Sequence, residues 1–220
     1  MTVRIVTDSA SDLTPGEAEA LGVDIVPLSI RFGDEVFLDR EELDVEEFYR
    51  RMASSEDLPQ TAAPAPGAFQ EVFRRRFAEG ADAIVCINLS SGVSATMESS
   101  ELAAREVDGD VRVVDSRSVT AGLGVMVQAA AQAAARGAST DEVVTLVEGM
   151  RDRTRVFGAI DTLENLKKGG RIGNAQALLG SVLSIKPLID ISSGVVEEAG
   201  RQRTRKKSLG WLRDLSLIHI

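Results

Sequence analysis

The segment from Ala83 to Ser100 holds residue types that could bind a small anion. It reads AIVCINLSSGVSATMESS, an apolar strand followed by a Ser/Gly turn and the start of a helix near Ser94. At such a junction the unpaired backbone N–H groups of the first helical turn and the positive end of the helix dipole face one point. The segment contains no lysine, so the donors there are neutral hydroxyl and amide groups. Neutral donors suit a carboxylate better than a triphosphate.

These polar residues also have simpler explanations. Serine is common at a helix start, where its side chain caps the backbone, so Ser94 has a structural interpretation beside the functional one. Thr61 is an ordinary loop hydroxyl unless it pairs with Ser94. Polar residues that follow two other predicted strands suit ligand contacts at a sheet edge and equally suit caps and turns. These residues are Asp8, Ser9, Asp115 and Ser116.

Two rare residue types narrow the chemistry. Cys86 is the only cysteine and lies on an apolar strand, which favours a role in the core and excludes a disulfide or cysteine metal site within one chain. His219 is the only histidine, so histidine metal sites and Ser-His triads lack their central residue. We therefore expect no bound metal and no hydrolase of the Ser-His type.

The charge balance and the apolar runs limit the partners. Acidic residues outnumber basic ones by 34 to 25, and the net charge is −9. This charge opposes attraction to a phosphate backbone, so nucleic acid is not an expected partner. The N-terminal residues do not resemble a signal peptide, and no apolar run approaches the length of a membrane span. We expect a cytoplasmic protein with no integral membrane insertion.

Strands and helices alternate through the first two thirds of the chain. Thr14 and Glu17 form the pattern of a capping box around a proline, and Gly22 ends that helix. Gly33 predicts a tight turn between two strands. The other expected elements are strands at Val3–Val6, Val23–Phe32, Glu35–Leu38, from Ala83 and at Val111–Val114, helices at Asp44–Met52, Ala68–Ala78 and Val119–Ala135, and a proline-rich loop at Leu58–Gly67. This order indicates a parallel sheet covered by helices on both faces.

The regular alternation of strands and helices ends near Thr154. The pattern predicts a strand at Arg155–Ile160, helices at Thr162–Lys168 and Asn174–Leu183, a hairpin of Lys186–Ile191 with Val195–Glu198, and a basic segment at Arg201–Lys207. We therefore expect an α/β chain with two domains. A Rossmann-like parallel sheet domain covers residues 1–153, and a smaller α+β domain covers residues 154–220.

Five segments, taken together, resemble the DegV family. They are VTDSASDL at Val6–Leu13, the Thr61 loop before Pro64, LSSGVSAT at Leu89–Thr96, VVDSRSV at Val113–Val119 and DTLENLKKGGRIGNAQALLGSVLSIKPLI at Asp161–Ile189. They occur in the family's order and with similar spacing, and the resemblance extends to about Leu212. The chain departs from the family pattern at Ala62-Ala63, where Ser-Gln is usual, and at Ala95, where Gly is usual.

The resemblance implies a function and a set of site residues. Family members are bacterial fatty-acid-binding proteins, and the best understood are the carrier subunit of fatty acid kinase. By this resemblance the protein shelters a long acyl chain and presents its carboxylate to a separate ATP-binding kinase subunit, without being an enzyme itself. The hydroxyls of Thr61 and Ser94 and the backbone N–H of Ala95 would bind the carboxylate. Arg203 matches an arginine tied to partner docking or phosphoryl transfer, and Arg171 fits a partner contact or an exposed helix end.

The resemblance also implies a lipid tunnel between the two domains. Family members continue beyond the length of this chain and include a histidine near the head group, to which His219 does not correspond. We therefore expect a second domain whose C-terminal part is truncated. The expected ligand is a long-chain fatty acid, and no other cofactor is expected.

Two other classes of protein stay open. One is a nucleotide-dependent enzyme on a Rossmann-like sheet, although neither G-x-x-x-x-G-K-[ST] nor G-x-G-x-x-G follows a predicted strand. The other is a regulatory protein-interaction module that binds no lipid. Nucleotide binding without a partner would favour the enzyme, and co-purified fatty acid would favour the carrier.

Overall fold

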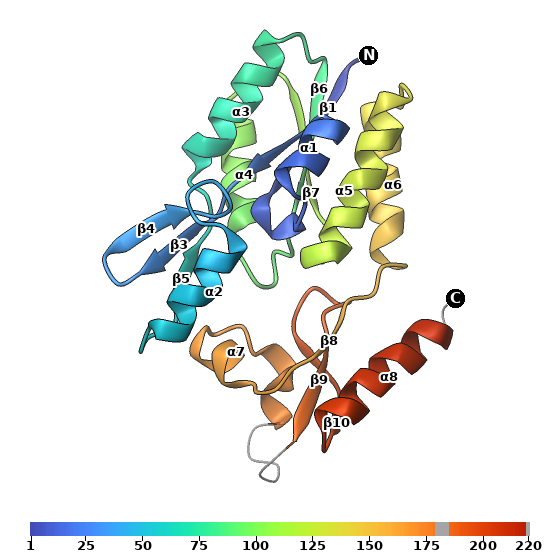
Figure 1. Ribbon diagram of the computed structural model, residues 1–220. Coiled ribbons are helices and arrows are strands. Elements are labelled where there is room, and N and C mark those ends of the chain that lie inside the picture. The colour runs from blue at the N-terminus through green and yellow to red at the C-terminus, as the bar shows by residue number, and fades with distance from the viewer. Residues whose placement is uncertain (179–184, 219–220) are drawn as a thin grey trace. The chain divides into compact units, whose positions relative to one another are not determined.

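The computed structural model describes residues 1–178 and 185–218, and the chain forms two compact units (Figure 1). The first unit spans Met1–Thr154 and the second Arg155–Ile220. Each unit has apolar residues packed in a core of its own. The described polar candidates for the carboxylate site all lie in the first unit.

The first unit is built on a four-stranded parallel sheet. All six residues of its central strand β6 are buried, as expected for a strand with helices on both faces. The apolar run in the sequence here therefore reflects burial on two sides. The strands are β1 (Val3–Asp8), β2 (Val23–Val26), β6 (Ala83–Asn88) and β7 (Asp110–Asp115), in the order β2-β1-β6-β7.

Helices cover both faces of this sheet (Figure 1). Val85 and Ile87 of β6 belong to the core that includes residues of α5 and α6, whereas Ile84 and Cys86 belong to the opposite core with α3 and α4. This alternation is the two-residue period of a strand and confirms the predicted α/β sheet. The helices are α1 (Pro15–Leu21), α3 (Pro66–Ala78), α4 (Thr96–Arg105), α5 (Thr120–Ala135) and α6 (Thr140–Arg151).

Local signals in the sequence explain the start and end of α1. The Thr14 side chain accepts a hydrogen bond from the Glu17 backbone, and the Glu17 side chain accepts one from the Thr14 backbone, which confirms the capping box. Gly22 ends the helix in the left-handed region with φ 66°. Gly33 has φ 58° in the predicted turn between two strands.

A second, antiparallel sheet lies in the first unit. It has the order β4-β3-β5, with a hairpin between β3 and β4 and a longer connection to β5 through α2. Asp44 caps α2 by accepting a hydrogen bond from the Glu47 backbone N–H at 2.8 Å. The elements are β3 (Ser29–Phe32), β4 (Glu35–Leu38), α2 (Val45–Ser54) and β5 (Gln60–Ala62).

Two expectations for the first unit are wrong in detail, and one helix was missed. The strand expected over Val23–Phe32 is two strands, because Pro27 has no N–H for the parallel ladder and the chain leaves the first sheet there. The loop expected over Leu58–Gly67 contains β5, which forms by pairing with β3. The helix expected near Ser94 begins at Thr96, and α6 was not expected although Ser139 and Glu142 form a capping box at its start.

The second unit is an antiparallel α+β structure. Its sheet has the order β10-β9-β8, with β9 paired to both neighbours. The helix expected at Asn174–Leu183 is a 3₁₀ helix over Gly173–Leu178, and the rest of that expectation falls on residues 179–183, outside the described ranges. Helix α8 was not expected. The elements are β8 (Phe157–Ala159), α7 (Glu164–Lys168), β9 (Lys186–Asp190), β10 (Glu197–Gln202) and α8 (Arg205–Ile218).

Candidate functional site

The carboxyl ends of β1 and β6 form a topological switch point. After β1 the chain continues through Leu13 and Leu21, which pack in the core with α5. After β6 it continues into α4, whose Ala103 packs in the opposite core with α3. Neighbouring parallel strands whose connections leave to opposite faces create a crevice at their carboxyl ends, where open α/β sheets bind ligands.

Asp8 is the last residue of β1 and is fully buried at this switch point. Its carboxylate accepts hydrogen bonds from the backbone N–H of Leu89 at 2.8 Å, from Asn88 Nδ2 at 3.2 Å and from the backbone N–H of Ala10 at 3.1 Å. Burial raises the pKa of Asp8 to about 6, although these hydrogen bonds lower it. The carboxylate therefore joins the end of β1 to the loop after β6.

Asn88 and Ser100 extend this buried polar group. Ser100 Oγ donates to Asn88 Oδ1 at 2.6 Å, and both residues are fully buried. Neither residue was a candidate in the sequence. The available signal was Asn88 itself, an amide at the end of an otherwise apolar strand, because a buried amide needs partners.

The loop between β6 and α4 is also tied to the loop after β7. Ser91 Oγ donates to Asp115 Oδ2 at 2.6 Å, and the Ser90 N–H donates to the Ser118 carbonyl at 2.9 Å. Ser116 N–H donates to the Asn88 carbonyl at 3.1 Å. Asp115 and Ser116 therefore help to hold the loop after β6 against the loop after β7. Ser9 has a similar contact, since its Oγ accepts from the Leu28 N–H at 3.1 Å.

Ser94 and Ala95 lie side by side at the start of α4. Ser94 Oγ accepts a hydrogen bond from the Thr96 N–H at 3.3 Å and lies 2.9 Å from Thr96 Oγ1. The residue in the N-cap position is Ala95, which has no side-chain oxygen. Among the described residues, the backbone N–H of Ala95 has no hydrogen-bond acceptor. The capping explanation for Ser94 is thus partly right, because its oxygen serves Thr96, one residue inside the helix.

Both residues line an open hollow of about 310 Å³. Ser91 and Met97 also contribute to its surface, and the carboxylates of Glu98 and Glu101 lie on its α4 side. The hollow thus combines hydroxyl and amide donors at one end with two negative charges at the other. A bound anion would be held by the donors and repelled by the carboxylates, which directs it toward Ser94 and Ala95.

Thr61 lies in the middle of β5, where it pairs with Ile30 of β3. Its side chain is exposed. Within residues 1–178 and 185–218, no hydrogen bond joins Thr61 to Ser94 or Ala95. The structure therefore brings Ser94 and Ala95 together and places Thr61 on the antiparallel sheet of the same unit.

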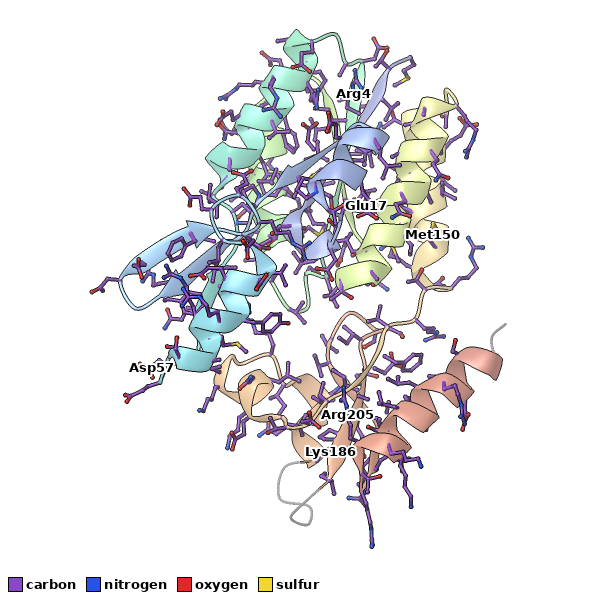
Figure 2. The ribbon with its side chains drawn as sticks, in the orientation of Figure 1. Arg4, Glu17, Asp57, Met150, Lys186 and Arg205 are labelled. Atoms are coloured by element: carbon purple, nitrogen blue, oxygen red, sulfur yellow. The ribbon has the colours of Figure 1, made fainter. Side chains whose placement is uncertain are left out.

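Arg171 and Arg203 lie in the second unit, and both are exposed. Arg171 follows α7 and donates through Nη1 to the Gly169 carbonyl at 2.7 Å. Arg203 lies in the bend between β10 and α8. The start of α8 is held by Arg205, which is labelled in Figure 2. Its Nη1 donates a hydrogen bond to the Ala159 carbonyl at 2.7 Å. The bend that carries Arg203 thus has a fixed helix on one side and a paired strand on the other.

The core role expected for Cys86 is confirmed. The residue is buried in the core beside α3 and α4, and burial raises the pKa of its thiol. Within the described ranges, no group of three or more histidine, cysteine, aspartate or glutamate side chains is placed to bind a metal ion. None of the helices in that part of the chain is long and apolar enough to cross a bilayer.

A parallel sheet with helices on both faces and a donor-lined loop at its switch point define an α/β protein with a candidate ligand site at the carboxyl edge of the sheet. The chain belongs to the DegV family, described as an uncharacterised protein family, whose pattern matches residues 2–218. A DegV domain-containing protein from Deinococcus radiodurans is 38% identical over 214 residues, which is 97% of this chain and 76% of that protein. A relative from Streptomyces coelicolor is 36% identical over the same shares.

Solved structures of similar proteins have the same fold. A fatty-acid-binding DegV family protein from Thermus thermophilus has a TM-score of 0.88 and 38% identity, covering 97% of this chain and 78% of that chain. DegV from Bacillus subtilis, a fatty-acid-binding protein, has a TM-score of 0.88 and 30% identity, covering 98% and 77%. A stearic-acid-binding protein from Eubacterium ventriosum has a TM-score of 0.89 and 27% identity, covering 97% and 75%.

Proposed function

We propose that this protein binds a long-chain fatty acid and presents its carboxylate to a separate ATP-binding kinase subunit, which converts it to an acyl phosphate. The observation that carries the proposal is the close likeness of its fold to fatty-acid-binding DegV proteins, at a TM-score of 0.88 and 38% identity for the Thermus thermophilus protein. The donors at the start of α4 support the same ligand class.

The hydrogen bonds around Ser94 suit it as a donor to a carboxylate. A serine oxygen can accept two hydrogen bonds and donate one. Thr96 supplies a backbone N–H and, in one orientation, a hydroxyl hydrogen to Ser94 Oγ. The hydroxyl hydrogen of Ser94 then points to an external acceptor. Together with the Ala95 N–H it would bind one end of the carboxylate, and the Thr61 hydroxyl would bind the other.

The acyl chain supplies most of the affinity in this proposal. Burial contributes about 0.8 kcal/mol per methylene, so a chain of about sixteen carbons gains on the order of 10 kcal/mol before the costs of binding. Each neutral hydrogen bond to the head group contributes only about 1 kcal/mol. The head-group donors therefore fix position. Neutral donors also leave the carboxylate oxygen more nucleophilic than an arginine ion pair would.

The carrier leaves phosphoryl transfer to its partner. The exposed guanidinium groups of Arg203 and Arg171 are the residues proposed to contact that partner or the transferred phosphoryl group, because planar guanidinium donors suit phosphate oxygens. For the acyl chain we propose no path beyond the tunnel that the family resemblance implies.

Organic extraction of the purified protein, followed by mass spectrometry, tests the proposal. We expect stoichiometric long-chain fatty acid from the wild-type chain and a clear reduction in the Thr61→Ala/Ser94→Ala double variant. Ser193→Ala, an exposed hydroxyl of the second unit, is the control and should keep its lipid. Extracts without fatty acid would favour a regulatory module, and tight nucleotide binding by the protein alone would favour an enzyme.

A further inference from the structure

Thr61 lies in a part of the first unit that stands outside both of its apolar cores. Residues 27–65 form an antiparallel lobe, which holds β3, β4, α2 and β5 beside the parallel sheet (Figure 1). No residue of this antiparallel lobe belongs to either described core of the first unit. Ile30, which is buried, pairs with Phe37 and Thr61 of the same lobe. Polar contacts therefore contribute more than usual to the position of the lobe relative to the parallel sheet.

The loop after β1 supplies two such contacts. Where the lobe begins, Ser9 Oγ accepts a hydrogen bond from the Leu28 N–H at 3.1 Å. Between β4 and α2, Arg40 Nη2 donates to Asp12 Oδ1 at 2.5 Å and forms an ion pair with it. The Asp12 side chain is 45% exposed and that of Arg40 is 23% exposed. One loop of the parallel sheet therefore holds the lobe at its first residues and again at the turn before α2.

Both partners of the ion pair have a left-handed backbone. Asp12 has φ 58° and Arg40 has φ 66°, values that are uncommon for residues other than glycine. The Arg40 N–H donates to the Leu43 carbonyl at 2.9 Å, which closes the turn around this conformation. Such residues persist where their surroundings fix them, and they are frequent at ligand sites and switch regions. The ion pair thus joins two loops whose conformations each cost free energy.

The loop after β1 also contacts the other half of the proposed carboxylate site. Asp8, which directly precedes Ser9, accepts a hydrogen bond from the Leu89 N–H at 2.8 Å. Leu89 begins the loop that leads to Ser94. The loop after β1 is therefore a polar connection between the lobe that carries Thr61 and the loop that carries Ser94.

We propose that Asp12 and Arg40 are positioning residues, whose ion pair fixes the antiparallel lobe so that the Thr61 hydroxyl meets a carboxylate bound at the start of α4. A donor contributes to affinity only when it is held in place before the ligand binds. With the pair broken, the lobe moves more freely about its attachment at Leu28, and the Thr61 hydroxyl contributes less to binding. The inference rests on the proposed function, because it takes Thr61 as a donor to the carboxylate.

A double-mutant cycle between Arg40 and Thr61 tests this role. Displacement of a fluorescent fatty acid gives the Kd of each variant. Thr61→Ala should raise Kd about fivefold in the otherwise wild-type chain, which corresponds to one hydrogen bond. In the Arg40→Asn background the same change should raise Kd less than about twofold. Asparagine tolerates the left-handed backbone, so this variant removes the charge and keeps the turn. If Arg40 only stabilised the fold, the two effects would multiply.

Two further variants keep the test decisive. Asp12→Asn removes the same ion pair from its other partner and should reduce the effect of Thr61→Ala equally. Glu35→Gln is the matched control, because it removes an ion pair with Arg51 at 2.8 Å that lies within the lobe. It should keep the fivefold effect. A fivefold effect that persists in Arg40→Asn or Asp12→Asn, or one that is lost in Glu35→Gln, would overturn the inference.

Hydrogen exchange separates this inference from the proposed function. The Leu28 amide is the hydrogen-bonded link where the lobe begins, so it should exchange about fivefold faster in Arg40→Asn than in Glu35→Gln. This measurement needs no ligand. Equal exchange in the two variants would show that the ion pair does not hold the lobe. Failure of the proposed function would instead appear as a wild-type chain that binds no fatty acid while its Leu28 amide still responds to Arg40→Asn.

Discussion

The Asp8 carboxylate accepts a 2.8 Å hydrogen bond from the backbone N–H of Leu89, 81 residues along the chain. This contact links the end of β1 to the loop that leads to Ser94. Because the same carboxylate also accepts from Asn88 and Ala10, it fixes both sides of the crevice at the switch point. The buried Asp8 carboxylate thus holds the start of the loop that carries the proposed head-group donors.

The first prediction concerns pH. The pKa of Asp8 is raised from 3.8 to about 6 by burial, so between these values the folded chain holds a proton that the unfolded chain has lost. The free energy of unfolding therefore falls as the pH rises through this window. The total loss reaches about 3 kcal/mol once the pH is above about 6. Urea unfolding of the wild type and of Asp8→Asn from about pH 4 to 7.5 gives the difference in the free energy of unfolding between the two proteins. If that difference does not change with pH, the prediction is contradicted.

The second prediction compares two helical glycines. A Cβ added at Gly124 of α5 would lie 2.6 Å from the Ser11 carbonyl oxygen, whereas one added at Gly149 of α6 would have no atom within 4 Å. Gly124→Ala should lower the free energy of unfolding by about 1–3 kcal/mol because the backbone must move. Gly149→Ala should raise it by about 0.5–1 kcal/mol through helix propensity. Chemical denaturation measures both, and a similar effect in both variants would show that the close contact is not limiting.

Short-range patterns predicted the α/β part of the fold well. The Thr14–Glu17 capping box, the left-handed Gly22 and the buried strand at β6 depend on neighbouring residues, so they could be identified without the structure. The start of α6 had the same kind of signal at Ser139 and Glu142. Its capping box was present in the sequence and could have been recognised.

Contacts between distant segments could not be predicted in this way. Strand β5 lies between prolines and forms because Thr61 pairs with Ile30, so its local sequence indicated a loop. The contacts of Asp8 with Asn88 and Leu89 depend on the neighbouring positions of β1 and β6 in the sheet. For the site, the sequence indicated the hydroxyls of Thr61 and Ser94. It did not indicate the buried hydrogen bond between Ser100 and Asn88.

The third prediction tests how Ser94 is oriented. Thr96→Val keeps the shape of a buried side chain and the backbone N–H, but removes the hydroxyl 2.9 Å from Ser94 Oγ. With one fewer partner to hold its hydroxyl, Ser94 should bind the carboxylate less well, by about fivefold in Kd for one hydrogen bond. Displacement of a fluorescent fatty acid measures this. Thr140→Val is the control, since its buried hydroxyl has no partner among the described residues, and an equal loss there would point to general destabilisation.

The fourth prediction separates lipid binding from transfer. Arg203 is exposed in the bend between β10 and α8, and in the proposed function it contacts the kinase partner or the transferred phosphoryl group. Arg203→Ala should leave the extracted fatty acid unchanged and lower acyl-phosphate formation with the kinase subunit by about tenfold or more, since a charged hydrogen bond contributes about 1.5–3 kcal/mol. Arg201→Ala, an exposed arginine on β10, is the matched control and should have the smaller effect. If Arg203→Ala loses its lipid, the residue supports the pocket and its proposed role with the partner is wrong.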